Sequence, residues 1–151
     1  MKARLNPYQA APELMKAMAG LESAVQASGL EPSLIDLVKT RASQINGCAF
    51  CIHMHTRDAR ARGETEERLY LLDAWHESPL YSERERAALA WTDAVTLIAQ
   101  THAPDAVYDE VRRHFAEGEL ANLTLLIATI NAWNRIAISF RLVHPGKAKT
   151  Q

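Results

Sequence analysis

The chain has 151 residues, of which 48% are hydrophobic, and this length and composition are typical of one soluble globular domain with a sizeable core. Its 17 basic and 18 acidic residues give a net charge of −1, which argues against nucleic-acid binding and against a basic membrane-binding surface. The N-terminus has no apolar run behind its charges, and no uninterrupted apolar stretch is long enough for a membrane span, so we expect a cytoplasmic protein.

Segments with helical periodicity, separated by Pro, Gly and Ser, follow one another along the whole chain. In the first segment, the period is carried by Leu14, Met18, Leu21 and Val25. The predicted helices cover about 12–28, 32–44, 48–62, 66–76, 82–99, 104–118 and 119–142, and no convincing strand alternation appears. We therefore predict an all-α fold of about seven helices in one domain, residues 1–151.

Start and stop signals set the predicted helix boundaries. Gly29 and Gly63 suit helix C-termini, where glycine readily adopts the left-handed conformation. Ser82 and Glu85 have the spacing of a capping box, and Pro104 suits the start of the next helix. The last helix is apolar on most sides, so we expect it to be buried in the core or in a subunit interface.

Residues 46–55 hold both cysteines of the chain and two of its six histidines. The spacing is Cys48-x-x-Cys51-x-x-x-His55, and a helix turns by about 100° per residue. Measured around the helix axis from Cys48, Cys51 then lies at about 60° and His55 at about 20°. His53 lies at about 140° from Cys48. We therefore expect His55, and not His53, to reach the thiols.

The position of the cysteines along this helix indicates a reactive thiol. Asn46 and Gly47 form a turn signal, and either can act as N-cap, which places both cysteines in the first helical turn. Free N–H groups and the helix dipole stabilise an anion there and lower a cysteine pKa. In a reducing compartment such a pair is redox-active or metal-binding more often than a static disulfide.

Several stretches of the chain resemble the AhpD-like alkylhydroperoxidases of the carboxymuconolactone decarboxylase-like superfamily. The similarity is carried by DLVKTRASQINGCAFCIHMH (36–55), RDAR (57–60), ERERAAL (83–89) and INAWNRIA (130–137). It covers most of the chain from about residue 30 to residue 140. The resemblance implies an all-α domain that assembles as a homo-oligomer, often a trimer or hexamer.

The family pattern, Glu-x11-Cys-x2-Cys-x3-His, implies a role for each matching residue. Cys51 matches the peroxidatic cysteine, Cys48 the resolving cysteine and His55 the histidine that transfers the proton. Asp36 occupies the place of the family glutamate. Aspartate is one methylene shorter, so its relay to His55 requires a bridging water or a shift of the second helix.

The predicted function is a thiol-dependent peroxide reductase that takes a small hydroperoxide as substrate, needs no bound cofactor and is reduced by an external dithiol or thiol protein. A general dithiol–disulfide oxidoreductase is an alternative, because the same cysteine pair serves both reactions. A non-enzymatic redox sensor or a zinc-binding module is another, with Cys48, Cys51, His55 and Asp36 as the possible zinc ligands. The decarboxylase branch of the superfamily is a weaker alternative, because decarboxylation of a lactone needs no thiol pair.

Other polar residues have structural interpretations. Asp36 also fits a capping box with Ser33, and the catalytic and capping roles do not exclude each other. Asn131, Asn134 and Arg135 are polar groups in an apolar helix and must be hydrogen-bonded if buried, so we expect a network that fixes helix register or a subunit contact.

Overall fold

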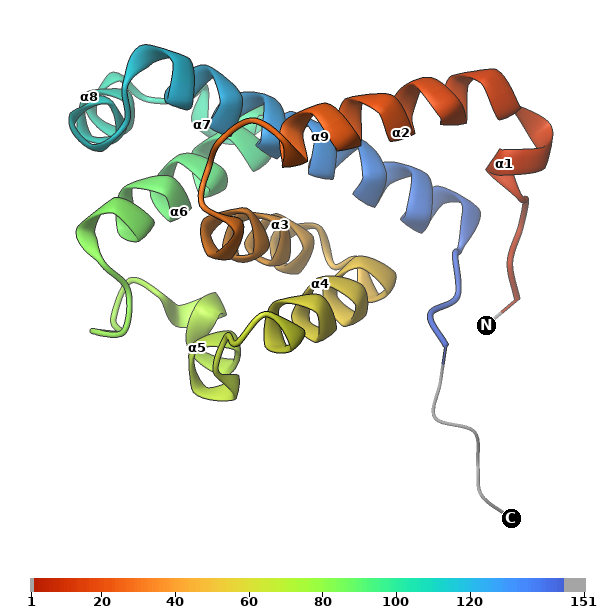
Figure 1. The fold of residues 1–151 in the computed structure, drawn as a ribbon, viewed down its shortest axis with the longest axis horizontal. Coiled ribbons are helices and arrows are strands. Elements are labelled where there is room, and N and C mark those ends of the chain that lie inside the picture. Colours follow the sequence, from red (N-terminus) through yellow and green to blue (C-terminus); the bar gives the residue numbers. More distant parts are fainter. Residues whose placement is uncertain (1, 146–151) are drawn as a thin grey trace.

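The computed structural model describes residues 2–145, and its regular structure in that range is entirely helical (Figure 1). The helices are α1 (Pro7–Ala10), α2 (Pro12–Gln26), α3 (Pro32–Asn46), α4 (Ala49–Ala61), α5 (Glu66–Leu71), α6 (Glu83–Thr96), α7 (Ile98–Thr101), α8 (Asp105–His114) and α9 (Glu117–Phe140), with a 3₁₀ turn at Leu72–Ala74. This confirms the predicted all-α class.

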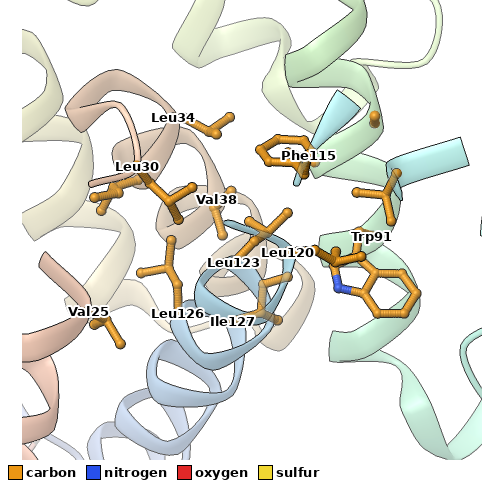
Figure 2. Packing of buried hydrophobic residues seen from close by; sticks show 14 of the residues in the cluster. Val25, Leu30, Leu34, Val38, Trp91, Phe115, Leu120, Leu123, Leu126 and Ile127 are labelled. Atoms are coloured by element: carbon orange, nitrogen blue, oxygen red, sulfur yellow. The ribbon is translucent and has the colours of Figure 1, made fainter. Parts of the chain in front are cut away.

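Helix α3 lies in the middle of the molecule and packs against α4, α6 and α9 (Figure 1). The main core forms where α2, α3, α6, α8 and α9 meet (Figure 2). Among its fully buried side chains are Val38, Leu123 and Ile127, each 0% exposed. Burial of one such side chain contributes roughly 1.5–3 kcal/mol to folding. Because α3 contributes to this core, its other faces are held in fixed positions for the site.

Helix α9 combines a long apolar sequence with partial burial. It is the only helix within residues 2–145 that is long and apolar enough to cross a membrane by length and composition, with a mean hydropathy of 1.3. Within this domain, 44% of that apolar window is buried, and the core helices of soluble proteins pass the same test. Leu125 and Ile138 remain 52% and 45% exposed, so the prediction of a core helix holds for part of its surface.

Several predicted boundaries were wrong, for local reasons. The Glu119 carboxylate accepts the Ala116 N–H at 2.9 Å, so α9 begins at Glu117 and Gly118 lies inside it instead of ending the preceding helix. The fourth predicted helix ends early, since α5 passes into the 3₁₀ turn, and α1 and α7 were not predicted. The capping box of Ser82 and Glu85 is confirmed.

The helical spacing of Leu14, Met18, Leu21 and Val25 predicted the first long helix, which is α2. It does not identify the face that packs on the core, because Leu14 is 72% exposed and Leu21 is 41% exposed, whereas Met15 and Val25 are buried.

The junction between α3 and α4 positions the cysteine pair. Gly47 has φ +67°, in the left-handed region, and ends α3, while Cys48 is the N-cap of α4. The prediction that Asn46 or Gly47 caps the cysteine helix was therefore wrong. Because Gly47 reverses the chain, Cys48 and Cys51 come directly after α3 and next to its C-terminal residues.

Candidate active site

Cys48 and Cys51 lie at the N-terminus of α4, as predicted, and are free thiols. They are 1% and 2% exposed and pack against Ala137 of α9, with Phe50 and Leu142 at the edge of the cluster. The first turn of α4 supplies free backbone N–H groups at this position. The pair is therefore shielded from bulk solvent at the electropositive end of a helix.

The surroundings of the two thiols separate their pKa values. The Cys51 thiol donates a hydrogen bond to the Cys48 sulfur, and with further donors from the backbone and from Asn134 this lowers the pKa of Cys48 to about 6. The same hydrogen bond, together with burial, raises the pKa of Cys51. At neutral pH the negative charge of the pair therefore resides on Cys48, with the shared proton on Cys51.

An amide network from α9 supports the thiols. Asn134 is fully buried, donates to Ser43 Oγ at 3.0 Å and accepts from Asn46 Nδ2 at 2.9 Å. Asn46 also donates to Asn131 Oδ1 at 3.0 Å, and Arg135 donates to the same oxygen at 2.9 Å. The predicted structural network is confirmed. Sequence reasoning missed that Asn134 also donates to the cysteine sulfurs, which helps to lower the pKa of Cys48 and opposes the rise in the pKa of Cys51.

Cys51 and His55 line one cavity of about 380 Å³, which we call the site cavity. His55 is 8% exposed, and its Nε2 atom is buried without a hydrogen-bond partner among residues 2–145. Burial, with a smaller effect of the Lys39 charge, lowers the pKa of His55 to about 4, so the imidazole is neutral at pH 7. A neutral imidazole with a free nitrogen can accept a proton.

His53 lies on the other side of α4, as its angular position predicted. It is half-buried, does not line the site cavity and stacks on His144 with 4.7 Å between ring centroids. The geometry of α4 therefore distinguishes the two histidines as expected.

Asp36 also lines the site cavity and is 4% exposed. Both of its carboxylate oxygens accept from Arg62 Nη1 at 2.6 Å. Burial raises the pKa of Asp36, and the Arg62 charge opposes that rise. The predicted capping box with Ser33 was wrong, because α3 begins at Pro32 after Glu31 and Asp36 lies beyond its first turn. Asp36 is thus held by an arginine at the wall of the cavity.

A second ion pair in the site cavity was missed by sequence reasoning. Lys39 is 1% exposed and pairs with Glu22, which also accepts from Gln26 Nε2 at 3.1 Å and Trp133 Nε1 at 3.2 Å. Asp36, Lys39 and Ser43 share one face of α3. A polar face among apolar neighbours is the sequence signal that could have identified Lys39 as part of the site. No sequence signal connects Glu22 to it, because the pair joins different helices.

The rest of the site cavity wall is formed by the polar side chains of Tyr8 and Asp58 and by apolar ones, Phe50, Met54, Trp133, Ala137 and Leu142. Within the part of the chain that the structure describes, no three His, Cys, Asp or Glu side chains converge to hold a metal ion. The ligand set suggested for zinc is therefore not brought together. The arrangement combines a buried thiol pair, a neutral imidazole and a cavity whose walls are partly apolar and partly formed by ion pairs.

Comparison with known families identifies the chain. The profile of the carboxymuconolactone decarboxylase family matches residues 12–94, more than half of the sequence. The chain belongs to the carboxymuconolactone decarboxylase family. This confirms the resemblance to the AhpD-like members of that superfamily.

Two relatives of this family member match it over nearly their whole length. The uncharacterized protein YdfG of Bacillus subtilis strain 168 is 47% identical over 139 residues, which are 92% of this chain and 95% of YdfG. A crystal structure from Agrobacterium tumefaciens is 50% identical, with a TM-score of 0.95 over 97% of this chain and 100% of that one. Its protein is of unknown function, and its name proposes an antioxidant defence role as AhpD.

A more distant likeness extends to the debrominase Bmp8. Its crystal structure has a TM-score of 0.78 and 22% identity, over 89% of this chain and 73% of Bmp8. At this identity the likeness shows a shared fold. The family assignment thus indicates an enzyme fold, and the reaction has to be argued from the site.

Proposed function

We propose that this protein is a thiol-dependent peroxide reductase acting through Cys48, Cys51 and His55. The observation that supports this most strongly is that Cys51 and His55 line one cavity while Cys51 is hydrogen-bonded to a Cys48 of low pKa. Family membership supports the same class, since the A. tumefaciens relative carries a name that proposes antioxidant defence.

In the first step, Cys51 reacts with a hydroperoxide in the site cavity. Its proton has two acceptors, the Cys48 thiolate to which it is hydrogen-bonded and the neutral His55 imidazole. The Cys51 thiolate attacks the terminal peroxide oxygen, the O–O bond breaks, and the alkoxide leaves and takes up that proton. Because thiolate nucleophilicity increases with pKa, Cys51 is the stronger nucleophile of the pair once deprotonated.

In the second step, the Cys48 thiolate attacks the sulfenic acid on Cys51. A disulfide forms, and the hydroxyl leaves as water with one proton. The ring closure is local, because only two residues separate the cysteines. An external thiol reductant then returns two electrons, so the cycle requires no bound cofactor.

Asp36 is proposed as the acid that supports His55. It acts from the wall of the site cavity, where Arg62 holds its carboxylate. Asp36→Asn is expected to slow peroxide turnover and leave the pKa of Cys48 unchanged, because Asp36 makes no contact with that sulfur. An unchanged rate in Asp36→Asn would remove Asp36 from the mechanism.

The test of the proposed function measures reduction of cumene hydroperoxide with dithiothreitol as reductant. Cys51→Ser is expected to lose turnover, and Cys48→Ser, mixed with peroxide before dithiothreitol is added, is expected to react once and stop at a sulfenic acid. Full turnover by both variants would refute the mechanism. Ser28→Ala serves as the control, since Ser28 lines neither cavity that holds a cysteine and its hydroxyl has no hydrogen-bond partner among residues 2–145.

A dithiol–disulfide oxidoreductase acting on a protein partner is the second candidate. The low pKa of Cys48 at a helix N-terminus favours it, because such a thiolate attacks disulfides and also leaves readily. Cys51→Ser should then trap a partner protein as a mixed disulfide through Cys48. Trapping together with absent peroxide turnover would replace the first proposal by this one, while disulfide formation without any turnover would indicate a redox sensor.

Homo-oligomer formation is also proposed. Leu14 and Leu21 lie about 20° apart around α2 and are both exposed, and Leu125 is exposed on α9, which packs against α2. Exposed large apolar side chains on two packed helices are compatible with a subunit interface. Light scattering after size exclusion should show a trimer or hexamer that Leu14→Glu dissociates, and a wild-type monomer would contradict the proposal.

A further inference from the structure

The two thiols of the pair line different cavities. Cys51 faces the site cavity with His55, whereas Cys48 lines a second cavity of about 320 Å³, which we call the Cys48 cavity. The Cys48 cavity is bounded by the start of α4, the end of α9 and the N-terminal segment. The N-terminal segment lies beside the end of α9 (Figure 1), because the Arg4 N–H donates to Phe140 O at 2.9 Å.

The two cavities differ in charge. Among residues 2–145, Arg4 and Arg141 are the charged residues that line the Cys48 cavity, and no carboxylate of that range lines it. Arg4 donates to the Ser139 carbonyl at 3.2 Å, and within residues 2–145 neither arginine forms an ion pair with a carboxylate. In the site cavity, in contrast, the carboxylates of Glu22, Asp36 and Asp58 are each paired with a cation, namely Lys39, Arg62 and Arg57.

We infer that the Cys48 cavity binds the reducing thiol and that this reductant is a small thiol carrying a carboxylate. The inference rests on the proposed function, since it assumes that the pair cycles through a disulfide. An anionic reductant is attracted by the two arginines of the Cys48 cavity, whereas the cations of the site cavity are already paired with carboxylates. Peroxide and reductant therefore approach the cysteine pair from different sides.

The exchange proceeds in two balanced steps. The reductant thiolate attacks Cys48 Sγ, a new S–S bond forms, and the Cys48–Cys51 bond breaks with its electron pair on Cys51, which takes up a proton. A second reductant thiolate then attacks the sulfur of the bound reductant. This step releases the oxidised reductant as its symmetric disulfide and leaves Cys48 as a thiolate. Two thiols have then supplied two electrons, and of their two protons one is on Cys51 and the other is released to solvent.

The hydrogen bonding of the pair favours this order of attack. In the first exchange Cys51 is the leaving group, and the cause that chiefly raises its pKa is the hydrogen bond to the Cys48 thiolate. That thiolate does not exist while Cys48 holds the reductant sulfur, so this cause is absent when Cys51 leaves. In the second exchange Cys48 is the leaving group, and its low pKa speeds its release.

The experiment uses full-length protein whose disulfide has been closed with diamide, so that peroxide reactivity is not required. Its rate of reduction is measured with N-acetylcysteine and with the neutral methyl ester of N-acetylcysteine, each normalised to thiolate concentration. We expect the carboxylate form to react about tenfold faster at low ionic strength and to lose this advantage as salt is added. In the double variant Arg4→Gln/Arg141→Gln, the ratio of the acid rate to the ester rate should fall to about one. The control is Arg112→Gln, which removes an exposed arginine of α8 and should leave this ratio unchanged.

The outcomes separate this inference from the proposed function. Equal rates for acid and ester in the wild type, or an unchanged ratio in the double arginine variant, would overturn the reductant site even if peroxide turnover is intact. A carboxylate preference without peroxide turnover would support the reductant site and overturn the peroxidase. A pair that diamide cannot close would overturn both.

Discussion

The hydrogen bond between the two thiols leads to a quantitative prediction about Cys48. Its pKa is lowered from 9.0 to about 6, a shift that corresponds to about 4 kcal/mol in favour of the thiolate. Four donors share this effect: the Cys51 thiol, which contributes most, the backbone N–H groups of Cys51 and Phe50, and the Asn134 amide. Cys51→Ala removes the largest contribution, so we expect the pKa of Cys48 to rise by about 1–2 units, whereas Cys51→Ser keeps a hydroxyl donor and should change it less.

The assay is the pH dependence of alkylation by iodoacetamide, supported by thiolate absorbance in the ultraviolet. Because the chain has only two cysteines, each Cys51 variant reports Cys48 alone. Asn134→Ala in the Cys51→Ser background should raise the pKa by about one further unit. Equal Cys48 pKa values in Cys51→Ala and Cys51→Ser would show that the thiol–thiol hydrogen bond does not stabilise the anion, and would refute this reasoning.

Three further predictions concern stability, measured by chemical denaturation. The pKa of His55 in the folded state is about 4, below its ordinary 6.5, so the free energy of unfolding falls as the pH drops from 6.5 to 4. His55→Gln should lose this acid sensitivity, which is worth up to about 3 kcal/mol. An unchanged pH profile in that variant would contradict the burial of a neutral imidazole. Lys39→Met leaves the Glu22 carboxylate without its cation and should lower the free energy of unfolding by roughly 2 kcal/mol. This loss is smaller than for a fully buried ion pair, because the Glu22 side chain is 27% exposed. The double variant with Glu22→Gln should recover much of that loss, and equal destabilisation of the two would argue against the ion pair. Leu123→Ala empties a fully buried position and should cost about 2–5 kcal/mol, and a loss below 1 kcal/mol would contradict the packing in Figure 2.

Features that depend on neighbouring residues could be predicted from the sequence. The helical period gives the all-α class, and the turn per residue places His55, and not His53, in the site cavity with Cys51. The capping box of Ser82 and Glu85 was predicted for the same reason, since both partners lie within one turn.

Features that depend on tertiary packing could not be predicted. Lys39 pairs with Glu22 from another helix, and the Asn46 amide meets Asn134 across 88 residues of sequence. In the sequence, Gly47 can either end one helix or begin the next. The choice between these two roles depends on how α4 packs against α3, and in the structure Gly47 ends α3. The separation of the thiols into two cavities likewise depends on where the end of α9 and the N-terminal segment lie.

We propose that Cys51, which faces the site cavity, reacts with peroxide before Cys48, which carries the charge. Mass spectrometry after one equivalent of cumene hydroperoxide, with dimedone to trap sulfenic acid, identifies the cysteine that is oxidised first. We expect a trapped sulfenic acid on Cys51 in Cys48→Ser and little or none on Cys48 in Cys51→Ser. Rapid trapping on Cys48 with an unreactive Cys51 would reverse the proposed roles of the two thiols.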